Sequence, residues 1–253
     1  MPNLRDVGGH PTRDGRVVRT GLLYRSGALP RLDGVDGEAF ARLGIRRVYD
    51  LRGARERDHA PDRLPPGTAY VVGDVLAGWS EGGPDRVFAW FEDPAAARRE
   101  LGGGGADALW TEQYRQLVTL PSARAAYGRL FREVAAAENR PALVHCSGGK
   151  DRTGWAVAAL LLLLDVARDA VMADYLRSNG SRDDPAVAAM LEALVERGGE
   201  PELWRPIFTA EPHYLEAALE EVRIAFGSIE AYFADGLAVD AATRDALRAA
   251  FIG

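Results

Sequence analysis

The stretch that decides the fold is PALVHCSGGKDRTGWAVAALLLLL, residues 141–164. Its first part, 141–146, is a short apolar run typical of a buried strand, and its last part, 155–164, has the composition of a buried helix. The loop between them holds the only cysteine of the chain, Cys146, and its only lysine, Lys150. Backbone N–H groups gather where a strand ends and a helix begins, and the helix dipole adds positive charge there. The stretch therefore predicts an anion-binding loop inside an α/β fold.

The rest of the first half alternates strand-like and helix-like stretches. A helical pattern closed by Gly44 predicts a helix at 36–44. Runs rich in β-branched and aromatic residues predict strands at 16–27, 45–52, 68–74 and 141–146. Strands separated by helices predict an α/β fold with a central, mostly parallel sheet flanked by helices.

The second half has mainly helical patterns. At 122–139, the apolar residues follow the i, i+3, i+4, i+7 spacing of one helix face: Tyr127, Leu130, Phe131 and Val134. Further helices are expected at 168–179, at 184–199 with its closing Gly198, at 213–227 with its closing Gly227, and at 240–251. No internal repeat and no long linker divides the chain. We therefore expect residues 1–253 to form one domain with a helical C-terminal portion.

Residues 75–108 depart from the alternation and read as an insertion. Gly83-Pro84 and Asp93-Pro94 predict the starts of two short helices, and glycines 102–105 follow them. Four large aromatic side chains in this insertion need a surface to cover: Trp79, Phe88, Trp90 and Phe91. Two interpretations are open, namely a lid that opens on a glycine hinge and a pair of helices packed permanently on the core.

Composition excludes several classes of protein. Of 253 residues, 47% are hydrophobic and 27% are charged, as in a soluble globular protein. The net charge of −6 argues against nucleic acid as a partner, and a single cysteine excludes a disulfide within the chain. The four histidines show no metal-ligand spacing. We therefore expect neither a metal nor a cofactor.

No transmembrane segment is expected. The longest apolar run, 155–164, is about half of what a spanning helix needs. Residues 1–16 lack the apolar core and the cleavage pattern of a signal peptide. We expect a cytoplasmic protein, with export that uses no recognisable signal peptide as the alternative. The sequence leaves the oligomeric state open.

The loop has the composition of an oxyanion cradle. Gly148 and Gly149 let the backbone curl tightly, as a phosphate cradle requires. Arg152 follows Cys146 by six residues, so its guanidinium can face the sulfur across a bound oxyanion, and its planar fork binds two oxygens at once. The expected anion-binding residues are Ser147, Gly148, Gly149, Lys150, Asp151 and Arg152.

A cysteine in this setting indicates phosphoryl transfer. The helix N-terminus and a nearby cation favour the thiolate of Cys146, which attacks phosphorus in line. The loop and Arg152 stabilise the transferring group, a carboxylic acid protonates the leaving oxygen, and water hydrolyses the thiophosphate. Thr153 is expected to donate a hydrogen bond to the sulfur and improve it as a leaving group. The reaction requires no metal.

The longer pattern H-C-x-x-G-K-D-R-T-G, residues 145–154, is more specific than the loop alone. It occurs in one chain with NLRDVGG at 3–9, LLYRSG at 22–27, DLR at 50–52 and DAVMADYLRSN at 169–179. Together these motifs resemble the bacterial cysteine-dependent tyrosine and dual-specificity phosphatases of the mycobacterial protein tyrosine phosphatase B type. The resemblance covers most of the chain and is weakest at 79–108, where that family carries a helical lid.

The resemblance implies a protein tyrosine phosphatase-like fold and a role for several residues. Cys146 is implied as the nucleophile and Arg152 as the clamp on the phosphate. Asp151 in the loop is the first candidate for the general acid. Asp74, at the end of a strand before the lid, is the second candidate.

The resemblance also implies substrates and supporting residues. The family acts on phosphotyrosine, phosphoserine/threonine and phosphoinositides, so the expected partner is a phosphorylated protein or a phosphoinositide. We expect Asp50 and Arg52 to support the site structurally and His145 to orient the cysteine. Asp6 of NLRDVGG is interpreted as a turn residue.

Other interpretations stay open at this point. Lys150 is either a contact to substrate phosphate or an ordinary solvated charge. A phosphate-binding module with weak catalysis, a sulfurtransferase and an arsenate reductase also carry a cysteine in an anion loop. A nucleotide-binding loop is excluded, because Asp151 stands where a magnesium-binding Ser or Thr should follow Lys150.

Overall fold

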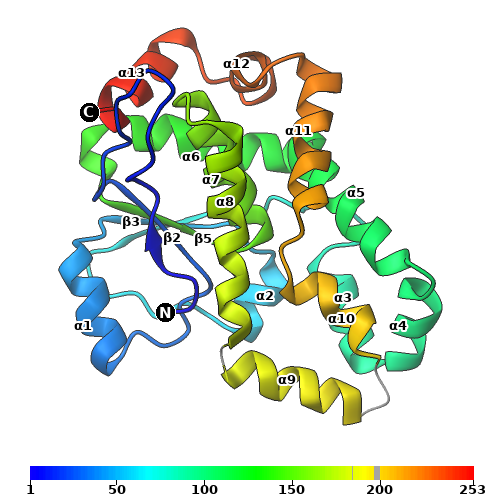
Figure 1. The fold of residues 1–253 in the computed structure, drawn as a ribbon. Helices are drawn as coiled ribbons and strands as arrows, with labels where there is room; N and C mark the ends of the chain where they lie inside the picture. The colour runs from blue at the N-terminus through cyan, green and yellow to red at the C-terminus, as the bar shows by residue number, and fades with distance from the viewer. Residues whose placement is uncertain (184, 197–199) are drawn as a thin grey trace.

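The computed structural model describes residues 1–183, 185–196 and 200–253. It has an α/β fold in which helices surround one sheet (Figure 1). The strands are β1 (Arg5–Asp6), β2 (Leu23–Ser26), β3 (Arg47–Asp50), β4 (Ala69–Val72) and β5 (Ala142–His145). Their order is β1-β2-β5-β3-β4, with β1 antiparallel to β2 and the other pairs parallel. The prediction of a mostly parallel sheet is confirmed.

Strand β5 occupies the centre of the sheet and is buried along its whole length. Its last residue, His145, pairs with Ser26 of β2 and Asp50 of β3. Because the pairs are parallel, the segments that follow β2, β3 and β5 leave the sheet at the same edge. Open α/β sheets bind ligands at this carboxyl edge.

The helices agree with most of the predicted segments, and the structure adds some that the sequence patterns did not indicate. Their bounds are α1 (Gly34–Leu43), α2 (Ala54–His59), α3 (Pro84–Glu92), α4 (Pro94–Leu101), α5 (Gly105–Thr119), α6 (Pro121–Ala135), α7 (Asp151–Leu163), α8 (Arg168–Leu176), α9 (Pro185–Glu196), α10 (Pro201–Phe208), α11 (Pro212–Phe226), α12 (Ile229–Ala231) and α13 (Ala241–Phe251). Gly227 ends α11 with a φ of 82°, whereas the predicted closing residue Gly198 lies outside the described residues. Helix α10 contains Pro206, a residue that normally breaks a helix, and this explains why the sequence did not predict it.

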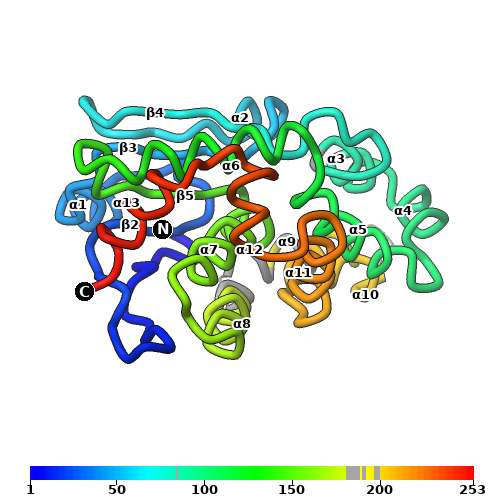
Figure 2. Tube along the Cα trace, turned by 90° about the horizontal axis from the view of Figure 1, so that it is seen from above, coloured from blue at the N-terminus to red at the C-terminus, as the bar shows by residue number. Residues whose placement is uncertain are grey.

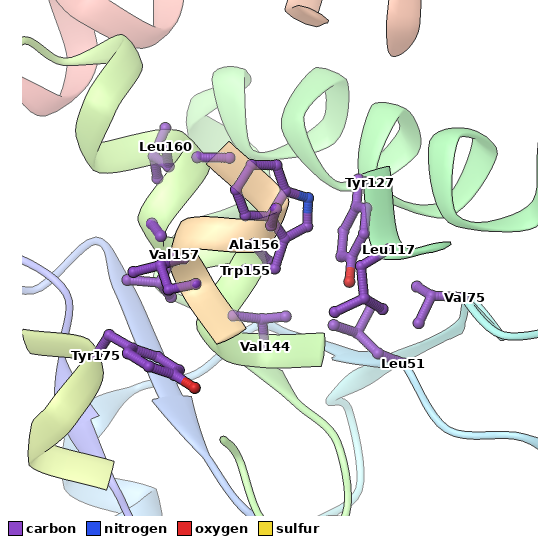
Figure 3. Packing of buried hydrophobic residues seen from close by; sticks show 14 of the residues in the cluster. Leu51, Val75, Leu117, Tyr127, Val144, Trp155, Ala156, Val157, Leu160 and Tyr175 are labelled. Carbon is purple, nitrogen blue, oxygen red and sulfur yellow. The ribbon is translucent and has the colours of Figure 1, made fainter. Parts of the chain in front are cut away.

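Helix α7 forms the middle of the hydrophobic core. Figure 3 shows its residues Trp155, Val157 and Leu160 in one cluster with Val144 of β5 and Tyr127 of α6. All five side chains are at most 1% exposed. Burial of each such side chain contributes about 1.5–3 kcal/mol, so this cluster fixes α7 against the sheet and holds its N-terminus in place. In the described part of the chain, no helix is long and apolar enough to cross a membrane.

The two helices of the predicted insertion are present as α3 and α4. The carboxylate of Asp93 caps α4 by accepting the N–H groups of Ala95 and Ala96, each at 3.0 Å. Trp90 is buried and donates its indole N–H to Glu100 at 2.8 Å. The expected end of the insertion, residue 108, lies inside α5. Figure 2 shows α3, α4 and α10 at the end of the molecule away from the two chain termini.

Candidate active site

The loop that follows β5 curls tightly before α7 begins at Asp151. Gly149 has a φ of 66°, and a Cβ at this position would lie 2.3 Å from the carbonyl oxygen of Ser26. A larger residue is therefore excluded at Gly149. A Cβ on Gly148 would meet no atom within 4 Å. Close packing therefore requires a glycine at position 149 but not at position 148.

The front of the loop presents free donors. With the acceptors that the structure describes, no N–H group of residues 147–150 makes a hydrogen bond. These groups precede the N-terminus of α7, where the helix dipole is positive. Free N–H groups at a helix N-terminus are a ready anion site. Cys146, only 2% exposed, begins this loop.

Arg152 is held in place by Glu56 of α2. Its Nη1 and Nη2 groups donate to the two carboxylate oxygens of Glu56, each at 2.6 Å. Burial acts to lower the pKa of Arg152, but the paired Glu56 raises it above its usual value, so the guanidinium stays charged. Burial acts to raise the pKa of Glu56, but Arg152, together with the hydrogen bonds from Ser147 and Gly53, lowers it below its ordinary value. Two of the five guanidinium N–H groups are used in this pair, which leaves others for a bound oxyanion.

Ser147 also binds Glu56, through its hydroxyl group. The side chain of Ser147 therefore turns to the carboxylate that orients Arg152. The backbone N–H of Ser147 makes no hydrogen bond with the acceptors that the structure describes, so it is the group of this residue that is left for an anion. Glu56 joins the loop and Arg152 into one unit, and the N–H of Gly53 donates to it at 3.0 Å.

The residues predicted to support the site form a buried network behind it. Arg52 donates to the two carboxylate oxygens of Asp50, at 2.9 and 2.7 Å, and to Asp62 at 2.8 Å. Burial acts to raise the pKa of Asp50, but the hydrogen bonds from Arg52, together with His145 and Tyr70, lower it to about 2. His145 places Nδ1 3.1 Å from the carbonyl oxygen of Cys146 and Nε2 3.0 Å from Asp62. Asp50, Asp62 and His145 lie close enough together for a metal ion, but Arg52 already pairs with both carboxylates.

Asp151 is bound from two directions through one oxygen. Its Oδ1 accepts from the Nζ of Lys150 at 2.7 Å and from the hydroxyl of Tyr114 at 2.9 Å. The hydroxyl of Tyr114 in turn lies 2.7 Å from that of Tyr175. Burial, together with the charge of Asp151, raises the pKa of Tyr114 well above its usual value, so Tyr114 remains a donor.

Lys150 is buried, at 4% exposure. Besides Asp151, its ammonium group binds the carbonyl oxygens of Pro206 at 2.9 Å and Thr209 at 3.1 Å. The interpretation of Lys150 as a solvated surface charge is therefore wrong. The three N–H groups of the ammonium have three acceptors within the protein in this arrangement, and they connect the loop to the end of α10.

Asp74 lies beside the pair formed by Glu56 and Arg152. Its Oδ2 and the Oε2 of Glu56 lie 3.3 and 3.6 Å from the position that a Cβ would take on Gly53. Its Oδ1 accepts the N–H of Leu76 at 3.1 Å. The two candidate acids thus approach the site from different elements, Asp74 after β4 and Asp151 at the start of α7.

Residues 1–253 match the tyrosine phosphatase family over the whole chain. The chain belongs to the tyrosine phosphatase family. It is 31% identical to the triple specificity protein phosphatase PtpB of Mycobacterium tuberculosis, over 99% of this chain and 96% of the relative. It is also 31% identical to a Cupriavidus necator protein classed as a tyrosine-protein phosphatase, over 96% of this chain and 84% of that protein. A tyrosine-protein phosphatase of Nostoc commune is 28% identical over 63% of this chain and 49% of that protein.

In this phosphatase, Thr153 does not bond to the sulfur as expected. Its hydroxyl is fully buried and has no hydrogen-bond partner among the described residues. The residue follows Arg152 at the start of α7, so the backbone places it next to the predicted site. The predicted hydrogen bond to Cys146 is absent from the structure.

The sequence did not identify three parts of the phosphatase site. Glu56 and Tyr114 bind Arg152 and Asp151, and α10 contacts Lys150. The sequence did contain a pattern that indicates Glu56. At the start of a helix, the free N–H of Gly53 can donate to a carboxylate three residues later in the chain. Tyr114 and α10 carried no such signal, because both reach the loop through long-range packing.

Proposed function

We propose that this phosphatase hydrolyses phosphate monoesters through a cysteinyl-phosphate intermediate on Cys146. The observation that carries the proposal is the front of the loop, where free N–H groups, the N-terminus of α7 and the guanidinium of Arg152 come together. This is the arrangement of donors that stabilises a transferring phosphoryl group. Membership of the tyrosine phosphatase family supports it independently and argues against a sulfurtransferase or an arsenate reductase.

The reaction proceeds in two displacements. In the first, the thiolate of Cys146 attacks phosphorus, a P–S bond forms, and the P–O bond to the leaving group breaks while an acid supplies a proton to that oxygen. In the second, water attacks phosphorus, its proton passes to a carboxylate, and the thiolate leaves. In both, Arg152 and the N–H groups of residues 147–150 bind the non-bridging oxygens. Arg152 is able to do so because Glu56 fixes its plane.

Asp151 is our first choice for the general acid, and Asp74 is the alternative. Asp151 stands at the first turn of α7, next to Arg152, with one carboxylate oxygen anchored by Lys150 and Tyr114. The anchored oxygen fixes the plane of the carboxyl group, so that the other oxygen has a defined direction. A positioned acid contributes about 10²–10⁴-fold to a rate. Lys150 acts on substrate through Asp151 in this proposal.

The substrate class that we infer is phosphotyrosine protein, together with phosphoserine/threonine protein or phosphoinositides. The support is sequence similarity. A relative that is 31% identical to this chain, in an alignment that covers 99% of it, carries the name triple specificity protein phosphatase. Kinetics on phosphotyrosine peptides, phosphoserine peptides and phosphoinositide micelles at equal concentration rank these classes. Turnover confined to one class contradicts the broader proposal.

The decisive experiment compares the protein with its Cys146→Ser variant on an aryl phosphate in the presence of a chelator. We expect the variant to lose about 10³-fold or more in kcat and to yield no phosphoenzyme with the acid-labile linkage of a thiophosphate. Asn139→Ala is the matched control, because Asn139 donates to Glu133 at 2.7 Å and lies before the opposite end of β5. Metal-independent turnover that survives in Cys146→Ser contradicts the mechanism.

A further inference from the structure

The carbonyl oxygens of residues 146–149 all accept hydrogen bonds from groups of the protein. Two of these bonds come from residues beside the loop: the N–H of Ala28 donates to Ser147 O at 2.9 Å, and Nδ1 of His145 lies 3.1 Å from Cys146 O. A carbonyl oxygen can only accept, so Nδ1 carries the proton in that contact. The front of the loop has free donors while its back has satisfied acceptors.

The other two carbonyls are bonded by side chains from the N-terminal part of the chain. Nδ2 of Asn3 lies 3.2 Å from Gly148 O and 2.9 Å from Gly149 O. Nη2 of Arg25 donates to Gly149 O at 2.8 Å. Asn3 lies more than 140 residues before the loop in sequence, so the fold brings this donor to the loop.

We propose that Asn3 is a positioning residue of the active site, which holds the peptide planes after Gly148 and Gly149 so that their N–H groups face the phosphate. A peptide unit is planar and trans, so the C=O of one residue and the N–H of the next point in opposite directions. A donor that holds Gly148 O from behind therefore turns the N–H of Gly149 forward. The same argument applies to Gly149 O and the N–H of Lys150.

The orientation of the Asn3 amide is determined by Arg5. Nη1 of Arg5 donates to Oδ1 of Asn3, and this leaves Nδ2 as the atom that faces the loop. Asn3 has a φ of 56°, in the left-handed region that asparagine tolerates better than most residues. Arg5 is in turn fixed by Asp174 of α8, whose Oδ1 accepts from its Nε at 3.0 Å.

Asp174 also fixes the second donor. Its Oδ2 accepts from Nη1 of Arg25 at 2.8 Å, and both side chains are at most 2% exposed. Burial is the main cause that lowers the pKa of Arg25, to about 10, so its charge is retained at neutral pH. One carboxylate thus orients two arginines, one of which bonds the loop directly while the other bonds it through Asn3.

This network gives three separate sequence motifs a common structural role. Asn3 and Arg5 belong to NLRDVGG, Arg25 to LLYRSG, and Asp174 to DAVMADYLRSN. Asp6 of the first motif accepts the N–H groups of Gly8 and Gly21, as expected of a turn residue. It shapes the chain that carries the network, while Asn3 contacts the loop itself.

The inference rests on the proposed function, because the oriented N–H groups matter only if the loop binds an oxyanion. Two variants of Asn3 test it. Asn3→Gly keeps the left-handed backbone without strain and removes the amide. Asn3→Asp keeps the shape and replaces the donor by a carboxylate, which repels the two loop carbonyls. We expect both variants to fold, as checked by circular dichroism and melting temperature.

Binding of tungstate, an oxyanion that is not turned over, gives a readout that does not depend on catalysis. Asn3→Gly removes the donor that orients two loop peptides, so we expect tungstate to bind about 3- to 10-fold more weakly to this variant, and more weakly still to Asn3→Asp. Turnover of an aryl phosphate should show a fall in kcat that exceeds the change in KM, since the oriented donors act most strongly on the transition state. Asn139→Ala should match the wild type in both measurements.

The outcomes separate the two proposals. If the wild type turns over aryl phosphate and both Asn3 variants bind tungstate and react as it does, the positioning role is wrong and the proposed function stands. If the wild type shows no turnover but the variants weaken tungstate binding in the expected order, the positioning role stands and the proposed function fails. A fall in melting temperature with unchanged tungstate affinity also contradicts the inference, because it indicates a purely structural residue.

Discussion

The loop is held on two sides by different kinds of contact. On the sheet side, Glu56 and Arg152 form a pair with side chains no more than 10% exposed. On the other side lie α3, α4, α9 and α10, which we call the helical cap. Arg98 and Glu200 connect α4 to the start of α10, and both are more than half exposed. Buried pairs are costly to break, whereas exposed pairs contribute about 0–1 kcal/mol.

Because the ion pair on the sheet side is buried and the ion pair of the helical cap is exposed, the two sides have different roles. The sheet side fixes the geometry of the loop before any substrate arrives, which is what electrostatic stabilisation of a transition state requires. The helical cap touches the loop through the ammonium group of Lys150 and its bonds to Pro206 and Thr209. Movement of α10 alone would therefore release Lys150 without breaking the pair formed by Glu56 and Arg152. Opening of residues 75–108 as a lid stays a prediction, and α3 and α4 of that segment are packed on the core in this structure.

The largest effect is expected from Glu56→Gln on the sheet side. The substitution leaves the buried charge of Arg152 without its partner, so we expect a loss of about 3–5 kcal/mol in the free energy of unfolding at pH 7. Chemical denaturation measures this directly. Arg129→Gln is a suitable control, since Arg129 pairs with Glu133 at the surface, at 2.7 Å. A loss as small as that of the control contradicts the account of the sheet side.

The pH dependence of the stability of Glu56→Gln provides a second test of the sheet side. The folded protein holds the pKa of Glu56 below its ordinary value of 4.5, so its contribution is fully present above that pH and is lost as the pH falls through the folded pKa. The difference in stability between wild type and Glu56→Gln should therefore be constant at neutral pH and shrink below about pH 4.5. A difference that stays constant into acid contradicts the assigned pKa shift.

The variants Asp151→Asn and Asp74→Asn test whether the general acid lies on the cap side or on the sheet side of the loop. Asp151 is bound to the cap through Lys150, while Asp74 lies beside Glu56 on the sheet side. We expect Asp151→Asn to lower kcat by about 10²-fold and to remove the basic limb of the pH–rate profile, with a much smaller effect of Asp74→Asn. The defect should shrink on a substrate with an acidic phenol as leaving group, because that oxygen needs less protonation. If only Asp74→Asn removes the basic limb, the acid lies on the sheet side.

The sequence predicted the parts of the molecule that depend on neighbours along the chain. The β5–loop–α7 stretch, the helix starts at Pro84 and Pro94, and the buried face around Tyr127 are all local patterns, and the structure confirms them. The partners of the loop come from far away in sequence, as Glu56 and Asn3 do. Local periodicity carries no information on which distant side chain meets the loop.

Lys150 illustrates the same limit. Its position in the sequence indicated a cation in an anion loop, and its neighbours along the chain could not show that it is buried. The burial arises because α10, with a proline inside it, packs over the loop. A helix that the sequence does not predict cannot be used to predict the environment of a lysine.

The smallest effect is expected from Glu200→Gln in the helical cap. Because the pair with Arg98 is exposed, the free energy of unfolding should change by less than about 1 kcal/mol. Hydrogen exchange gives the sharper comparison: amides of α10 should exchange faster in the variant, while those of β5 should keep the wild-type rate, since only the cap is loosened. A loss of stability as large as that of Glu56→Gln, or faster exchange in β5, means that the two sides open together, and the cap is then part of the same rigid unit as the loop.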